Sequence, residues 1–231
     1  PAYYNTAAIG TTDLLKIRAG MRMQWVGIDN APHTFLAIAD MPFKLFNKRF
    51  GVGLVMQQES LGLFKNMNIG AQIAYKQKLF KGTLSIGAQI GFFDQSFKGS
   101  EVYIPDDDDY HQSTDEAIPQ QDIRGNAFDL GLGLFYTHRW FWAGLSATHL
   151  NSPSVKLDAE TGENGNERNY EFNLGRTLYF MAGSNIPVKN TLFEVLPSVL
   201  VKTDFTFTTW EATARVRYNK FLTGGFGYRW K

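Results

Sequence analysis

The sequence predicts an all-β protein, an antiparallel transmembrane β-barrel. Three observations support this class. Polar and apolar residues alternate over stretches of about ten residues, the length that a tilted membrane strand requires. The chain contains 22 glycines and 15% aromatic residues, a composition typical of barrels. It has no apolar run of the roughly eighteen residues that a membrane helix needs.

The clearest evidence is the stretch 66–93, which has the pattern of one complete hairpin. In its first arm, one face is apolar and consists of Met67, Ile69, Ala71, Ile73 and Tyr75. The opposite face consists of Asn68, Gly70, Gln72, Ala74 and Lys76. The second arm repeats this alternation after a reversal at 78–82. A polar face rich in glycine suits a barrel lumen, so we expect the apolar face to contact lipid.

The other strands are predicted in chain order by the same alternation. They lie at 15–26, 33–41, 50–58, 126–138, 141–149, 170–184, 192–203, 206–218 and 221–230. The segments 1–13 and 42–49 are predicted to be irregular or linking, and 98–125 and 151–169 to be long polar loops. The hairpin brings the total to about eleven strands, whereas single-chain bacterial barrels close with an even number. We therefore expect 1–231 to be a single barrel domain lacking its last strands, with twelve to fourteen in the complete protein.

Charge divides between the short and the long connections. The short connections carry cations and no acid, namely Lys44, Lys48, Arg49, Lys78, Lys81, Arg139, Lys189 and Lys220. The two long loops carry the carboxylates, and bacterial barrels place tight turns in the periplasm and long loops outside. We therefore predict a basic periplasmic rim. Its candidate partner-binding residues are Lys44, Lys48, Arg49, Lys81, Arg139 and Lys189.

Two further patterns fit this orientation. Aromatic residues beside the short turns predict a girdle at the membrane interface. The alternative is that aromatic residues simply favour strands. The residues of this predicted girdle are Phe43, Phe46, Phe50, Phe80, Trp140, Phe141, Trp142, Phe193, Tyr218 and Phe221. Charged residues share one face of two strands, and we expect them to face the lumen; they are Lys16, Arg18 and Arg22, and Glu211, Arg215 and Arg217. Such charges either fill the lumen or line a solute path.

No enzymatic chemistry is predicted. The four histidines do not form a ligand cluster, no Gly-x-Ser-x-Gly elbow occurs, and the absence of cysteine excludes disulfides and thiolate metal sites. No catalytic residue, cofactor site or metal site is therefore expected. The run Asp106–Asp109 offers carboxylates to calcium, but lacks the ligand spacing of a calcium loop. We expect a solvated loop and leave calcium binding by 98–125 open. No basic helix or aromatic platform indicates nucleic-acid binding.

The stretch 24–32, Gln-Trp-Val-Gly-Ile-Asp-Asn-Ala-Pro, resembles a motif of the PorP/SprF family of Bacteroidota outer-membrane proteins. Asn30 stands where that family usually has glycine, and asparagine tolerates the left-handed turn conformation. Further similarities are the opening Pro1-Ala2-Tyr3-Tyr4, 50–53 (Phe-Gly-Val-Gly), 196–202 (Leu-Pro-Ser-Val-Leu-Val-Lys) and 224–229 (Gly-Gly-Phe-Gly-Tyr-Arg). The family carries further strands after this last segment.

This resemblance implies a non-enzymatic outer-membrane barrel of the type IX secretion and gliding machinery. Its expected partners are the periplasmic lipoprotein-containing ring, a large cell-surface adhesin and outer-membrane lipid. It implies a role in exporting or anchoring particular surface proteins. Two alternatives stay open at this point: a solute channel of porin or fatty-acid-transporter type, and a structural anchor for one surface adhesin.

Overall fold

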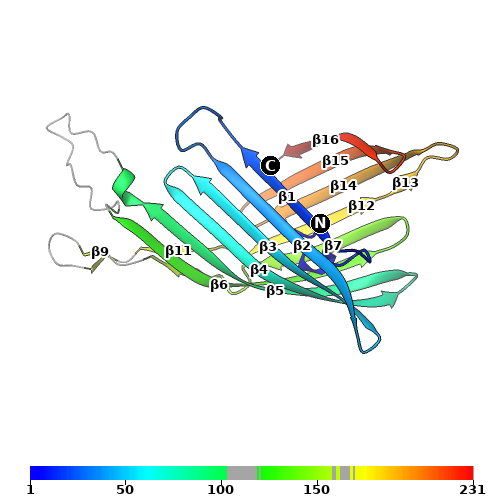
Figure 1. The fold of residues 1–231 in the computed structure, drawn as a ribbon, viewed down its shortest axis with the longest axis horizontal. Coiled ribbons are helices and arrows are strands. Elements are labelled where there is room, and N and C mark those ends of the chain that lie inside the picture. Colours follow the sequence, from blue (N-terminus) through cyan, green and yellow to red (C-terminus); the bar gives the residue numbers. More distant parts are fainter. Residues whose placement is uncertain (103–118, 120, 158–159, 162–166, 169, 231) are drawn as a thin grey trace.

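A computed structural model describes residues 1–102, 119, 121–157, 160–161, 167–168 and 170–230 (Figure 1). One large antiparallel sheet of 12 strands dominates it, which confirms the predicted all-β class. Its strands are β1 (Lys16–Met23), β2 (His33–Leu45), β3 (Lys48–Leu61), β4 (Phe64–Leu79), β5 (Gly82–Lys98), β6 (Asp122–Thr137), β7 (Phe141–Thr148), β12 (Thr177–Ser184), β13 (Ile186–Pro187), β14 (Phe193–Thr203), β15 (Thr208–Tyr218) and β16 (Leu222–Trp230). They pair in chain order, with β7 beside β12, β12 beside β14, and β13 on β14 alone.

Two small sheets lie near the long loops. One pairs β8 (Ser154–Lys156) with β11 (Glu171–Asn173), and the other pairs β9 (Glu160–Thr161) with β10 (Glu167–Arg168). The prediction of one strand over 170–184 is therefore wrong, because the chain leaves strand conformation at 174–176 between β11 and β12. The predicted loop 98–125 is shorter than expected, since β5 continues to Lys98, a 3-10 turn η2 (Gly99–Glu101) follows, and β6 begins at Asp122. Asp106–Asp109 lies outside the described residues.

Two hairpins close with two-residue turns in which both residues have positive φ, at 46–47 (48° and 58°) and 80–81 (48° and 61°). The turn between β15 and β16 has three residues, 219–221, and the first two also have positive φ (47° and 57°). This geometry matches the right-handed twist of the flanking strands. The expected link over 42–49 is accordingly wrong: β2 runs to Leu45 and β3 begins at Lys48, because a two-residue reversal suffices.

Burial in the sheet is inverted relative to a water-soluble protein. On β4 and β5, Ile69, Ile73, Ile86 and Ile90 are 45–56% exposed, whereas the polar, glycine-containing face is buried. The predicted assignment of the two hairpin faces is confirmed in this respect. We call the concave, buried side of the sheet the inner face. Among the described residues, no helix has the length and apolarity to span a bilayer.

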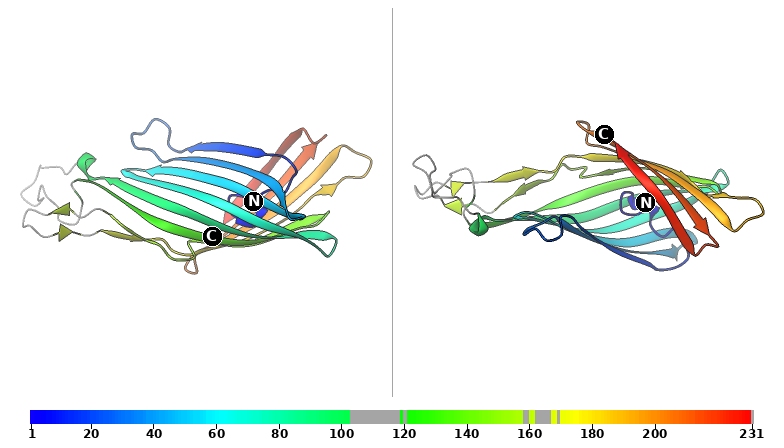
Figure 2. Two further views of the ribbon diagram at one scale, coloured as in Figure 1. Left: turned by 60° about the horizontal axis from the view of Figure 1, so that its bottom comes forward. Right: turned by 90° about the horizontal axis from the view of Figure 1, so that it is seen from above.

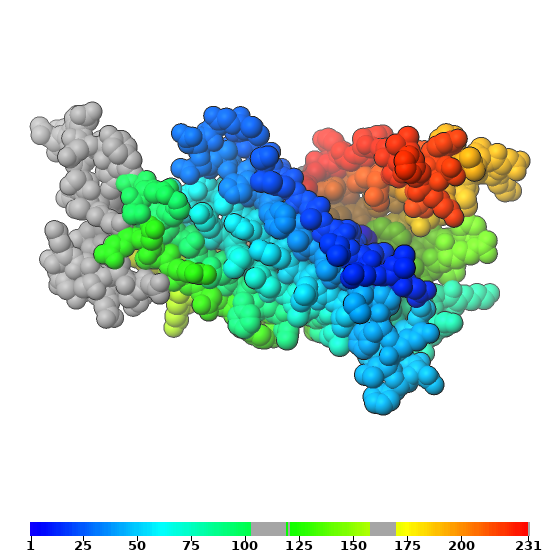
Figure 3. Space-filling view, viewed as in Figure 1, coloured from blue at the N-terminus to red at the C-terminus, as the bar shows by residue number. Residues whose placement is uncertain are grey.

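The sheet curls around the first residues of the chain (Figure 2). The short turns project from one end and η2 and β9 lie at the other, with β1 and β16 as the two edges of the sheet (Figure 1). Within the described residues, neither edge has a strand on its free side, so the sheet is not closed. Figure 3 shows β1 and the C-terminal strands as separate masses at the upper edge. Closure by further strands stays a prediction.

Candidate functional site

The inner face holds a compact segment at the start of the chain, residues 1–10, which we call the plug. It includes the 3-10 turn η1 (Thr6–Ala8), capped by Asn5, whose side-chain oxygen accepts from the backbone N–H of Ala7 at 2.9 Å. Asn5, Ala7 and Ile9 are completely buried. Burying a side chain the size of Ile9 contributes about 1.5–3 kcal/mol. The plug has no strand, as the sequence predicted, and among the described residues it contributes four members, Ala2, Ala7, Ala8 and Ile9, to the buried apolar cluster.

Hydrogen bonds tie the plug to strands far along the chain. The Asn5 side-chain amide donates to the backbone carbonyls of Leu134 on β6 at 2.9 Å and Leu145 on β7 at 3.2 Å. The backbone N–H of Gly10 donates to a carboxylate oxygen of Asp40 at 2.8 Å. Asp40 lies on β2, is 1% exposed, and also pairs with Arg18 of β1. The plug thus connects β2 with β6 and β7.

Glycines on the inner face make room for the plug. A Cβ atom at Gly87 of β5 would lie 2.6 Å from the backbone of Ala7, and one at Gly51 of β3 would lie 2.9 Å from the carbonyl oxygen of Ile9. Gly133 of β6 and Gly144 of β7 similarly face the Asn5 side chain. Because contacts this short are essentially never tolerated, only glycine permits the close approach at these positions. The sequence did not predict this packing, and the glycines on the inner face are the signal that could have indicated it.

The structure places all six predicted partner-binding residues at the short-turn end. Lys44 and Arg49 are directly opposite each other on β2 and β3, Lys48 begins β3, and the others occupy the turns after β4, β6 and β13, namely Lys81, Arg139 and Lys189. All six are exposed. We call this set the basic rim. Its binding of a partner stays a prediction.

Several members of the basic rim already make contacts within the chain. The Arg49 guanidinium pairs with Asp13, which follows the plug. The Lys48 ammonium lies 5.7 Å from the ring centre of Tyr75, and the Arg139 guanidinium lies 4.4 Å from that of Trp140. Such cation–π contacts leave the charge available at the surface.

Three adjoining hollows open at this end. The inner one, of about 150 Å³, is lined by Gly10, Thr11, Asp13, Arg49, Lys76, Lys78, Thr83, Ser85 and Thr137. A second, of about 600 Å³, shares Lys78, Thr83 and Thr137 with it and extends over the turns to Lys81 and Arg139. A third, of about 470 Å³, shares Asp13 and Arg49 and extends to Lys44. Together they form one continuous basic surface from the rim to the base of the plug.

The strands after β12 present charged residues on their inner face. Arg217 of β15 pairs with Glu194 of β14, and Arg229 of β16 pairs with Glu211 of β15, with an Arg229 Nη2–Glu211 Oε2 distance of 2.7 Å. The register places Arg215 in the same inner face, beside Leu196. The expected inward orientation of these charges, and of Arg18, agrees with the structure.

Asp129 of β6 is a buried carboxylate that the sequence did not single out. It is 1% exposed, and its carboxylate lies 3.0 Å from Nδ1 of His149, just after β7. His149 also packs edge-on against Phe93. Among the described residues no group of three metal-ligating side chains occurs.

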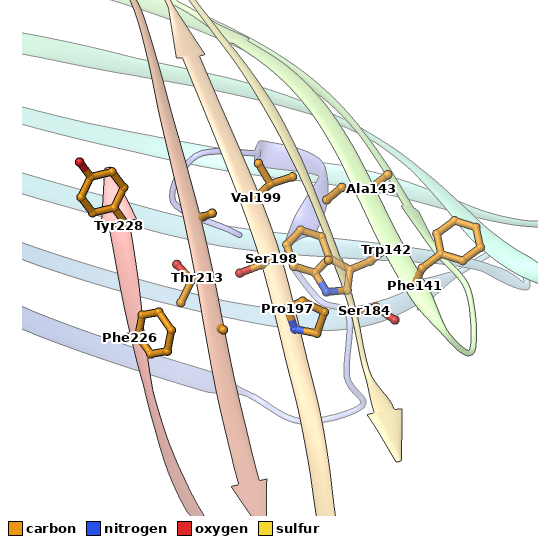
Figure 4. A pocket seen from close by; sticks show the side chains of 14 residues that line it. Phe141, Trp142, Ala143, Ser184, Pro197, Ser198, Val199, Thr213, Phe226 and Tyr228 are labelled. Atoms are coloured by element: carbon orange, nitrogen blue, oxygen red, sulfur yellow. The ribbon is translucent and has the colours of Figure 1, made fainter. Parts of the chain in front are cut away.

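An apolar hollow of about 620 Å³ lies on the outer face (Figure 4). One register row across five strands lines it with mostly small side chains: Ala143, Ala182, Val199, Ala212 and Tyr228. Phe226 and Tyr228 stand on one side and Phe141 on the other. A surface of this kind suits acyl chains rather than water.

The aromatic residues at the short turns have mixed roles. Phe46, Phe80 and Phe221, at the three tight turns, are 83–91% exposed, as a girdle requires. Trp142 instead faces inward and stacks on Phe135 with ring centres 5.7 Å apart. Strand alternation places Phe141 outward and therefore Trp142 inward.

These features define a membrane protein that crosses the bilayer with strands, whose apolar residues face outward and whose inner face is polar and plugged. The family model for the type IX secretion system membrane protein PorP/SprF matches residues 1–231, the whole chain. The chain therefore belongs to the PorP/SprF family, as the resemblance in its motifs predicted. No curated protein and no solved structure gives a significant match.

Proposed function

We propose that this protein is a non-enzymatic outer-membrane component of type IX secretion whose basic rim binds periplasmic ring components. It assists the export or surface anchoring of specific cargo, such as a large adhesin. The observation that carries the proposal is the gathering of the six rim cations at one end, with no Asp or Glu in the tight turns themselves. A rim of one charge sign steers and orients a complementary partner.

The plug supports this proposal over a solute channel. In the described part of the chain, Asn5, Ala7 and Ile9 are completely buried against the inner face between β3 and β7, in the space where a channel would hold water. A channel requires an inner face that water can fill. The plug does not distinguish a secretion component from a simple adhesin anchor, which the experiment must do.

The experiment is co-purification from native membranes in a mild detergent, followed by mass spectrometry. Wild-type protein is compared with a triple variant, Lys44→Glu, Lys81→Glu and Lys189→Glu, and with a matched control, Lys65→Glu. Lys65 is an exposed residue near the long-loop end of β4. Recovery of ring lipoproteins with wild type and control, and their loss with the triple variant, is the expected result.

Two outcomes would contradict the proposal. If the triple variant recovers ring components as well as wild type does, the basic rim does not bind them. If wild type and the control variant recover one large surface protein and no periplasmic component, the result would favour a structural anchor for a surface adhesin. Single-channel conductance of the wild-type protein would restore the channel alternative.

A further inference from the structure

We propose that the inner hollow between the plug and the basic rim is a carboxylate-binding site that receives an acidic side chain of a polypeptide partner. This inference rests on the proposed function, because it names the chemistry by which the rim would select its partner. The hollow has three cations, Arg49, Lys76 and Lys78, against the single carboxylate of Asp13.

The register places two of these cations in an unfavourable arrangement. Arg49 of β3 and Lys76 of β4 are directly opposite each other on the inner face. Like charges directly opposite in a sheet are destabilising. Lys78 follows on the same face of the same strand, since side chains two residues apart share a face. The chain therefore concentrates positive charge where strand pairing alone would disfavour it, and a bound anion offsets this repulsion.

The chain itself demonstrates that this place accepts a carboxylate. Asp13 reaches the hollow from the segment after the plug and pairs with Arg49. Among the described residues, Lys76 and Lys78 have no carboxylate within ion-pair distance. Lys76 is half-buried, so its charge is less screened than that of a surface lysine. These two ammonium groups are the part of the site open to an external anion.

Hydroxyl groups complete the lining. Ser85 of β5 is opposite Lys76, Thr83 of β5 is opposite Lys78, and Thr137 of β6 is opposite Thr83. Thr11 contributes a fourth hydroxyl from the segment after the plug. Hydroxyl and ammonium donors together match the several lone pairs of a carboxylate. The lining contains no large apolar side chain.

The position of the hollow favours a polypeptide over a lipid headgroup. Arg49, Lys76 and Lys78 belong to the inner-face register, whereas lipid contacts the outer face. The hollow joins the two larger rim hollows through shared residues, so an extended chain lying on the rim reaches it directly. An acidic segment crossing the rim would insert one carboxylate between Lys76 and Lys78.

The test measures binding of a fluorescent hexaglutamate peptide to the full chain in detergent, with hexaglutamine as the matched peptide. The variants are Lys76→Gln and Lys78→Gln, with Lys76→Arg retaining the charge and Lys65→Gln as a distant control. A hydrogen-bonded charge contributes enough that each Gln variant should weaken binding roughly tenfold. Lys76→Arg and Lys65→Gln should stay within about twofold of wild type, and hexaglutamine should not bind. Lys78 is exposed, whereas Lys76 is half-buried. Replacing Lys78 should therefore leave folding intact even if replacing Lys76 disrupts it.

Three outcomes would overturn the inference. If Lys189→Gln, in the rim but outside the hollow, weakens binding as much as Lys76→Gln, the binding is general rim electrostatics. If millimolar inorganic phosphate abolishes peptide binding, the site takes small oxyanions rather than a polypeptide. If hexaglutamate does not bind while ring components still co-purify, the carboxylate site fails and the proposed function stands.

Discussion

The inner face is stabilised differently in the two parts of the sheet. From β2 to β7 the plug covers it, glycines allow close backbone contact, and the carboxylate of Asp40 is 1% exposed. From β14 to β16 the inner face is more open: Leu200 of β14 still packs against the plug, but every residue of β16 is exposed, and partly solvated ion pairs such as Arg229–Glu211 line the face. The first part resembles a protein core and the second a solvated surface. Equivalent chemical changes should therefore have large effects in the first part and small effects in the second.

The largest effect is expected for Gly87→Val in the plug seat. The new side chain would collide with the backbone of Ala7, so the plug must leave or the sheet must shift, at a cost of about 1–3 kcal/mol. The chain has no cysteine, so Ala7→Cys introduces a single thiol. The accessibility of this thiol reports whether the plug is seated on the inner face. Maleimide labelling of Cys at this position should be slow in the wild-type background and roughly tenfold or more faster with Gly87→Val.

The matched control for this experiment is Gly20→Val on β1. A Cβ atom at Gly20 would meet no other atom within 4 Å, so this position has space for a larger residue. Labelling at position 7 should not change. Equal labelling rates with both variants would show that the plug does not depend on the glycine seat.

A smaller but clear effect is expected for Asp40→Asn. Replacement keeps the shape but removes the charge that holds Arg18 and receives the Gly10 N–H. Hydrogen bonds to buried charged groups contribute about 1.5–3 kcal/mol, and the free energy of unfolding in urea should fall by that order. Position 7 should also label faster, because the single amide oxygen of Asn cannot accept from both Gly10 and Arg18 as the two carboxylate oxygens do. Unchanged stability would mean that the plug is held by packing alone.

Glu211→Gln in the C-terminal part is the counterpart of Asp40→Asn. Its partner Arg229 is 60% exposed, so the ion pair is screened by water. We expect a loss of about 0.2–1 kcal/mol that diminishes at high salt, and no change in labelling at position 7. A loss as large as that of Asp40→Asn would refute the distinction between the two parts.

The smallest effect concerns the turn between β14 and β15. Asp204 accepts hydrogen bonds from the backbone N–H groups of Thr206 at 2.9 Å and Phe207 at 2.6 Å, which lowers the pKa of its carboxyl below the ordinary value of 3.8. Its stabilising contribution is therefore complete above that value and is lost as the pH falls through the lower, folded-state pKa. The difference in thermal unfolding between wild type and Asp204→Asn should be constant near neutral pH and shrink below 3.8. If the difference does not depend on pH, the ionised carboxylate of Asp204 is not what stabilises this turn.

The sequence by itself determined most strands of the large sheet, their faces and the basic rim. Alternation with a period of two requires only local geometry, so the inner and outer faces of 66–93 follow from residue order. The cations of the short turns likewise gather at one end once antiparallel strands alternate in direction. Applied to Phe141 and Trp142, the same rule turns Trp142 inward, so the prediction that placed it in the girdle because it lies beside a turn was wrong.

Only the tertiary structure decided the role of the plug. Residues 1–10 have no strand periodicity, and the carbonyls that Asn5 binds lie 129 and 140 residues further along the chain. Likewise, Asp13 meets Arg49 across 36 residues, and this contact helps to form the inner hollow. Local patterns carry no information about such distant partners, because the curling of the sheet brings them together. The strands were therefore predictable from the sequence, whereas what fills the space they enclose was not.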